Sequence, residues 1–225
     1  MQKEKQIVED IPEGRPVRIP VGGIVLDGDL TLPINAKGLV IFAHGSGSSR
    51  KSPRNQYVAQ VLNEHNLGTL LTDLLTADEE KIDRQTRHLR FDISLLADRL
   101  EHIILWAREY PETQNLSFGA FGASTGAAAA LIATARRPET VKAVVSRGGR
   151  PDLAMEFLPL VKAPALLIVG GHDPEVLHLN REALEKLNIW STINVIPRAT
   201  HLFEEPGALE NVAQLAATWF EQHLE

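Results

Sequence analysis

The chain has no cysteine among its 225 residues, which excludes disulfide bonds, thiolate metal ligands and a cysteine nucleophile. It has no apolar run that approaches the length of a membrane span, and its polar N-terminus lacks the basic start and apolar core of a signal peptide. The net charge of −6 argues against a nucleic-acid or anionic membrane surface. We therefore expect a cytoplasmic protein with no membrane and no nucleic-acid partner.

The length is sufficient for one full-sized hydrophobic core. A chain of 225 residues fits one α/β domain, and no Pro/Gly/Ser-rich linker or abrupt shift in composition divides it. We therefore assign residues 1–225 to a single domain, and we expect a monomer or a weak homodimer.

Short apolar runs alternate with segments of helical periodicity along the chain. Two alternating runs flank Gly22-Gly23, the turn signal of an antiparallel hairpin. The predicted strands cover 16–21, 24–32, 38–43, 69–75, 116–121, 141–146, 165–171 and 192–196. The predicted helices cover 57–65, 93–107, 127–135, 152–160, 175–188 and 206–224. Strands that alternate with helices indicate an α/β protein with a mostly parallel sheet and right-handed crossovers.

The segment from Thr76 to Arg90 differs from the rest of the chain. It is crowded with charged residues and has few apolar anchors. This composition favours a solvated loop; the alternative is a short lid over a pocket.

A Gly-Ala-Ser-Thr-Gly stretch at Gly122 to Gly126 lies between a predicted strand and a predicted helix. A serine at such a corner, with glycine two residues away on either side, is typical of a nucleophile elbow. We expect a turn so tight that a Cβ at either glycine would collide with its surroundings, and a strained backbone that exposes the Ser124 hydroxyl.

Three residues follow strands and have the chemistry of a catalytic triad: Ser124, Asp173 and His201. In a parallel sheet, active residues lie beyond the carboxyl ends of the strands. His201 would take the serine proton as general base, and Asp173 would orient its imidazole. Taken alone, Asp173 before Pro174 is also typical of a helix cap. Asp152 also follows a strand and ranks second for the acid.

The loop that begins at His44 is rich in backbone N–H groups that could stabilise an oxyanion. We expect one donor to be the N–H of Thr125, the residue after the nucleophile, and the other to be the N–H of Ser46. His44 itself is interpreted as structural rather than as a second base. A metal site is not expected, since His172, Asp173 and His178 form no recognised ligand spacing.

Two arginines, Arg147 and Arg150, follow the strand after the elbow helix. Guanidinium groups on this rim could bind a carboxylate or phosphate of a substrate. The alternative is a structural salt bridge to the acidic residues that the chain has in excess.

Together these residues resemble the α/β-hydrolase superfamily, and within it the dienelactone-hydrolase-like group. The chain looks most like the small hydrolase domains found alone or joined to phosphoribosyltransferase-like domains. The stretches that carry the resemblance are 44–47, 122–126, 145–152, 170–173 and 199–206. The resemblance implies an α/β-hydrolase fold with about eight strands, helices on both faces, and ester-type hydrolysis without a cofactor. Ser124 replaces the cysteine of true dienelactone hydrolases, so their lactone substrate does not carry over.

The sequence therefore predicts a serine hydrolase for a small carboxylic ester, lactone or thioester, which passes through an acyl-enzyme. Two alternatives stay open. One is acyl transfer on the same triad. The other is a hydrolase fold that serves as a binding module with its site unused, which the low aromatic content of 5% and the lack of a large cap domain favour.

Overall fold

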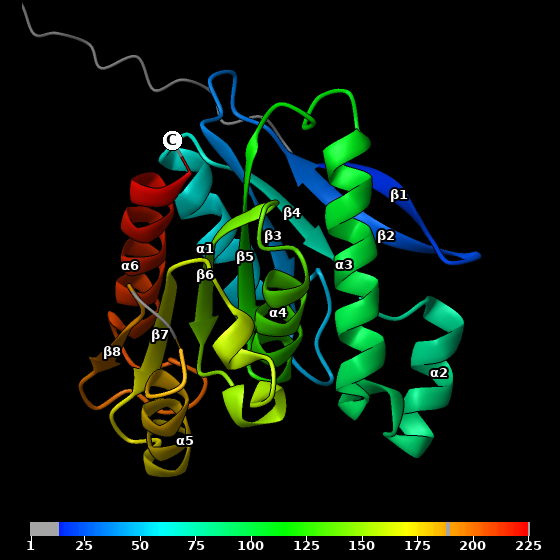
Figure 1. The fold of residues 1–225 in the computed structure, drawn as a ribbon. Coiled ribbons are helices and arrows are strands. Elements are labelled where there is room, and N and C mark those ends of the chain that lie inside the picture. Colours follow the sequence, from blue (N-terminus) through cyan, green and yellow to red (C-terminus); the bar gives the residue numbers. More distant parts are fainter. Residues whose placement is uncertain (1–13, 188–189, 225) are drawn as a thin grey trace, which may run out of the picture.

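The computed structural model describes residues 14–187 and 190–224, and these contain one eight-stranded sheet (Figure 1). The strands lie in the order β1-β2-β4-β3-β5-β6-β7-β8. They are β1 (Arg15–Val21), β2 (Ile24–Thr31), β3 (Gly38–Ala43), β4 (Gly68–Thr72), β5 (Ser117–Ala123), β6 (Val141–Arg147), β7 (Ala165–Gly170) and β8 (Thr192–Ile196). β1 pairs antiparallel with β2, and β2 pairs antiparallel with β4. The remaining neighbours in the sheet, β4-β3-β5-β6-β7-β8, all pair in parallel. The predicted hairpin and mostly parallel sheet are confirmed.

Helices cover both faces of the sheet, as predicted. The helices are α1 (Pro53–Glu64), α2 (Ala77–Thr86), α3 (Ile93–Glu109), α4 (Thr125–Arg136), α5 (Pro174–Leu184) and α6 (Ala208–His223). Helices α1 and α6 lie on one face, and α3, α4 and α5 lie on the other (Figure 1), where their apolar side chains pack against the strands. Among the described residues, no helix is both long enough and apolar enough to cross a bilayer.

Three helix predictions need correction. α1 begins at Pro53 rather than at Tyr57, because Ser52 caps it and proline is favoured at the first helical position. The helix expected over 152–160 is instead two short 3₁₀ turns, because Pro159 cannot continue an α-helix. α5 ends at Leu184, before the predicted end at Asn188, which lies outside the described residues.

The segment from 76 to 90 is not the solvated loop that its composition favours. It forms α2 and a 3₁₀ turn at Leu89–Phe91. Thr76 and Glu79 form a capping box, in which each side chain accepts a hydrogen bond from the backbone N–H of the other residue. α2 stands beside the N-terminal half of α3, away from the sheet (Figure 1). Periodicity misses this helix because one buried carboxylate, Asp83, anchors it instead of an apolar stripe.

The elbow at Ser124 follows β5, which lies near the middle of the sheet. Every residue of β3 is buried, as expected for a central strand with helices on both faces. Ten successive residues of α4, from Thr125 to Thr134, are buried, and five of them are alanines. Small side chains let this helix pack closely between the sheet and α3, which fixes the position of its first turn.

Candidate active site

Ser124 sits at the corner between β5 and α4 in a strained conformation, with φ 51° and ψ −121°. Its backbone N–H donates to the carbonyl of Arg147 at 3.1 Å. A Cβ at Gly122 would lie 2.3 Å from the Ala127 Cα, and a Cβ at Gly126 would lie 2.3 Å from the Ala43 carbonyl oxygen. Both separations are far below contact distance, so the steric reason expected for the two glycines is confirmed.

The structure brings Ser124, Asp173 and His201 together from three loops at the carboxyl ends of β5, β7 and β8. The His201 Nδ1 lies 2.7 Å from the Asp173 Oδ2, and the His201 Nε2 lies 3.3 Å from the Ser124 Oγ. Because a carboxylate only accepts, the proton of the neutral imidazole belongs on Nδ1. Nε2 is then free to accept the serine proton.

Asp173 occupies the N-cap position of α5, but its side chain makes no capping hydrogen bond. Its carboxylate points to His201 instead, so the helix-cap alternative for this residue does not describe its side chain. The competing Asp152 accepts two hydrogen bonds, each of 2.8 Å, from the guanidinium of Arg150. Of the two candidate acids, only Asp173 contacts the histidine.

Backbone hydrogen bonds join the loop that carries Asp173 to the loop that carries His201. The His172 N–H donates to the Ala199 carbonyl at 2.9 Å, and the Gly171 N–H donates to the Ile196 carbonyl at 2.8 Å. The Thr200 N–H donates to the Glu205 carboxylate at 3.0 Å. These bonds help to fix the imidazole and the carboxylate relative to each other.

His44 has a structural environment. Its Nε2 accepts from the Leu74 N–H at 3.1 Å, so the ring proton is on Nδ1, which donates to the Gly45 carbonyl at 2.9 Å. Burial lowers the pKa of His44, which keeps the ring neutral. Since both nitrogens are engaged, this histidine has none left to act as a second base.

The two expected oxyanion donors lie at neighbouring positions, but one of them has a partner. The Ser46 N–H donates to the Thr125 Oγ1 at 2.9 Å. Thr125 is the first residue of α4, where backbone N–H groups have no acceptor within the helix. An oxyanion bound here would share the Ser46 N–H with the threonine hydroxyl or displace that hydroxyl by rotation about χ1.

The two rim arginines differ. Arg150 is paired with Asp152, which raises the pKa of its guanidinium, so the salt-bridge alternative describes this residue. Arg147 is 9% exposed, and its Nη1 has no hydrogen-bond partner among the described residues. Burial and the nearby Arg54 lower the pKa of Arg147 to about 10. Its guanidinium carbon lies 6.0 Å from the centre of the Phe121 ring.

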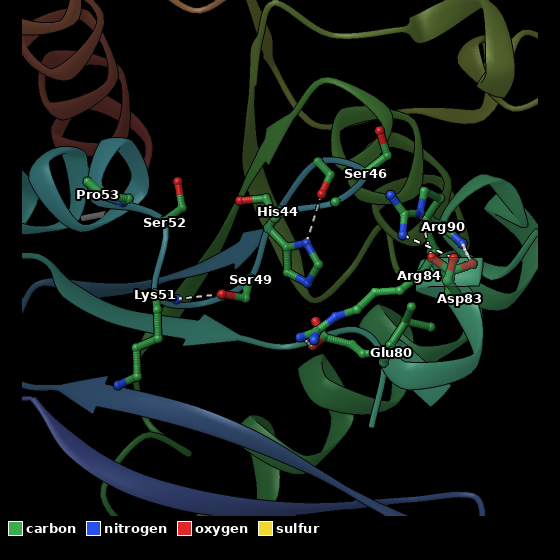
Figure 2. A pocket seen from close by; sticks show the side chains of 15 residues that line it. His44, Ser46, Ser49, Lys51, Ser52, Pro53, Glu80, Asp83, Arg84 and Arg90 are labelled. Atoms are coloured by element: carbon green, nitrogen blue, oxygen red, sulfur yellow. Dashed lines mark hydrogen bonds and ion pairs between the residues drawn. The ribbon is translucent and has the colours of Figure 1, made fainter. Parts of the chain in front are cut away.

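Two adjoining cavities open at this end of the sheet. The smaller has a volume of about 220 Å³ and is lined by both Ser124 and His201. The larger, of about 450 Å³, lies between the loop after β3 and α2. Figure 2 shows the ion pair of Asp83 and Arg90 on the α2 side of this larger cavity, with Lys51 on the opposite side. The two cavities lie side by side, since both are lined by Gly45, Ser46, Ser48 and Ser52.

Sequence reasoning missed Arg54, which lines the smaller cavity, and Asp73, which binds the backbone N–H and the side chain of Arg50. The dipeptide Ser52-Pro53 is a helix-start signal that would have placed Arg54 in a first helical turn. No sequence signal points to Asp73. Among residues 14–187 and 190–224, no three His, Asp or Glu side chains are grouped to hold a metal ion.

The sheet order, the helices on both faces and the strained serine corner define a protein of the α/β-hydrolase fold. The sequence profile of the dienelactone hydrolase family matches residues 33–225, so the chain belongs to this family. The chain is similar to the solved structure of a dienelactone hydrolase from Anabaena variabilis, which is 60% identical and superposes with a TM-score of 0.94 over 95% of this chain and 99% of that one. Family membership supports a hydrolase that acts on a small molecule.

Est1E from Butyrivibrio proteoclasticus is similar in fold, with a TM-score of 0.78 and 16% identity over 93% of this chain and 98% of that one. Proteins of two Mycobacterium tuberculosis strains, provisionally named phosphoribosyl transferases, are 53% identical over 208 residues. The match covers 92% of this chain but only 46% of each of these relatives.

Proposed function

We propose that the chain is a serine hydrolase that cleaves a small carboxylic ester, lactone or thioester. The observation that carries the proposal is the connected series of Asp173, His201 and a strained, accessible Ser124 at 2.7 and 3.3 Å. Free serine is a weak nucleophile at neutral pH, and a histidine at hydrogen-bond distance is the group that activates it.

In the first half of the reaction, the Ser124 Oγ attacks the carbonyl carbon and its proton moves to the His201 Nε2. The Asp173 carboxylate stabilises the resulting imidazolium. The N–H groups of Thr125 and Ser46 bind the tetrahedral oxyanion. The C–O or C–S bond to the leaving group then breaks, His201 protonates the leaving group, and an acyl-serine remains.

In the second half, His201 takes a proton from water, and the hydroxide attacks the acyl-serine carbonyl. Collapse of the second tetrahedral intermediate releases the carboxylic acid and returns the proton to Ser124. The His201 side chain is 38% exposed, so solvent reaches the base. This access supports hydrolysis over acyl transfer, and product analysis in the presence of added alcohols or amines separates the two.

The same cluster argues against a binding module with an unused site, because the strained serine is costly to maintain without a use for it. Phosphoribosyl transfer in the name of the mycobacterial relatives belongs, on this proposal, to the part of those proteins outside the match.

The test is labelling with a fluorophosphonate, followed by intact mass. We expect one adduct per wild-type chain and none on Ser124→Ala or His201→Ala. Ser94→Ala, which removes an exposed serine on α3, is the control and retains the label. Labelling of folded Ser124→Ala, or no labelling of folded wild type, overturns the proposal.

A further inference from the structure

Arg147 is a buried cation that forms no ion pair with any residue in the described part of the chain. It lies at the end of β6, directly beside the elbow in register with Ala123, and lines the smaller cavity with Ser124 and His201. Its Nη1 has no partner among the described residues, whereas Arg150, three positions later, is fully paired with Asp152. An unpaired buried charge is costly, so a charge of this kind beside the serine calls for a ligand.

Arg54 places a second cation in the same cavity, from the first turn of α1. Its Nη1 donates to the Glu204 carboxylate at 3.0 Å, but that carboxylate is 65% exposed. Its Nε is buried and has no partner among the described residues. Two like charges that line one small cavity repel each other unless an anion lies between them, and the downward shift of the Arg147 pKa has this repulsion as its second cause.

The start of α1 adds to the positive potential. The helix carries no acidic residue in its first turn, which is where helices commonly have one. Ser52, its N-cap residue, lines the cavity together with Arg54. The positive end of the α1 dipole therefore lies at the cavity, next to both guanidinium groups.

We propose that the smaller cavity is an anion subsite in which Arg147 and Arg54 bind a carboxylate or phosphate group carried by the substrate. This inference rests on the proposed serine hydrolase and narrows its substrates to anionic esters. The anion would accept from the guanidinium groups of Arg147 and Arg54, whose several N–H donors suit planar or tetrahedral oxyanions. With a volume of about 220 Å³, the cavity admits one such group beside the reacting carbonyl.

The test compares matched anionic and neutral esters. 4-Acetoxybenzoate against its methyl ester places a carboxylate on the leaving group, and mono(4-nitrophenyl) adipate against 4-nitrophenyl hexanoate places it on the acyl group. 4-Acetoxyphenyl phosphate against phenyl acetate tests phosphate. We expect wild type to favour the anionic member of at least one pair by about tenfold or more in kcat/KM, as hydrogen bonds to charged groups provide.

We expect this preference to be lost in Arg147→Met and reduced in Arg54→Met. Arg108→Met is the control with the same change in net charge. Arg108 belongs to the last turn of α3, and that end of the helix lies at the opposite end of the sheet (Figure 1). Thermal unfolding of Arg147→Met distinguishes a binding role of this arginine from a structural one. Removal of an unpaired buried cation should leave the unfolding midpoint unchanged or raised. If the ratio of kcat/KM for the anionic and the neutral ester is near one in all pairs for wild type, the subsite is overturned. A ratio in Arg147→Met that equals the wild-type ratio also overturns it.

Calorimetric binding of 4-hydroxybenzoate and of inorganic phosphate to the whole chain gives a second, activity-independent readout. Binding that is lost in Arg147→Met supports the subsite even if no ester is cleaved and Ser124 is not labelled, an outcome that would refute only the hydrolase. Equal binding by wild type and Arg147→Met overturns the subsite even if the hydrolase stands.

Discussion

Asp173 and His201 belong to loops 28 positions apart, yet the aspartate oxygen and the histidine Nδ1 lie 2.7 Å from each other. The carboxylate sits where a helix-capping side chain would be and does not cap. α5 therefore forgoes a contact that commonly contributes about 1 kcal/mol, and the side chain is directed into the site instead. A trade of stability for position is typical of functional residues.

We predict that Asp173→Asn lowers kcat by about 10³- to 10⁴-fold with little change in KM, because an amide at this position stabilises the wrong imidazole tautomer. Steady-state kinetics on an ester that wild type cleaves provides the measurement. Asp152→Asn is the matched control, since this carboxylate pairs with Arg150 and not with the histidine, and its kcat should stay within about twofold. Equal losses in the two variants would show that the acid is misassigned.

The fold and the strained serine corner were predictable because each has a local signature. β3 is apolar along its whole length, and Gly122 and Gly126 stand where backbone contacts leave no room for a Cβ. The positions of Asp173 and His201 follow from the rule that side chains after parallel strands meet at one edge. Once the strands are identified, proximity of these residues follows from the topology.

The features that could not be predicted depend on contacts between residues far apart in the sequence. Whether Arg147 and Arg150 are paired is decided by which carboxylate the fold brings to each, and both look alike in the sequence. α2 was missed because its anchor is a buried ion pair of Asp83 with Arg90. Likewise, the hydrogen bond from the Ser46 N–H joins it to a hydroxyl 79 residues away. Such contacts have no periodicity.

A second prediction concerns Gly126, whose missing side chain lets α4 approach the end of β3. We predict that Gly126→Ala lowers the free energy of unfolding by about 3 kcal/mol, because the new Cβ would meet a backbone carbonyl that cannot rotate away. Fluorophosphonate labelling should be lost in parallel, since the elbow must shift. Urea unfolding gives the stability. Gly171→Ala, at the same edge of the sheet, is the control. A Cβ at Gly171 would lie 3.3 Å from the Ile196 carbonyl oxygen, so this change should alter the free energy of unfolding by less than about 1 kcal/mol.

A third prediction concerns pH and His44. Burial lowers the pKa of His44 below its ordinary 6.5, so the unfolded chain takes up a proton at a higher pH than the folded chain does. The stability that the neutral ring provides is fully present above about pH 6.5 and is lost as the pH falls from there through the folded-state pKa. Unfolding in urea between pH 8 and pH 5 should show this decline.

His44→Gln tests the cause, because its amide oxygen can accept from the Leu74 N–H without titrating in this range. We expect a flatter dependence of stability on pH in this variant. His102→Gln, which replaces an exposed histidine on α3, should keep the wild-type slope. A wild-type slope in His44→Gln would assign the acid sensitivity to other groups.

The last prediction concerns α2 and the larger cavity that it borders. The buried Asp83 carboxylate accepts from the Leu89 N–H at 2.8 Å, the Arg90 N–H at 3.2 Å and the Arg90 Nε at 2.5 Å. Removal of its charge leaves these donors poorly paired, so we predict that Asp83→Asn lets α2 open locally while the sheet stays folded. Hydrogen exchange should accelerate over residues 77–91 and remain unchanged in β3 and β5.

Asp78→Asn makes the same change of charge on the same helix, where the carboxylate is 87% exposed and pairs with Lys81. Its exchange pattern should match that of wild type, because exposed ion pairs contribute little. If α2 forms a wall of the substrate site, Asp83→Asn should also raise KM for esters with long acyl chains more than for acetates. Faster exchange in Asp83→Asn with unchanged KM for long-chain esters and for acetates would show that α2 does not act as a lid over the substrate site.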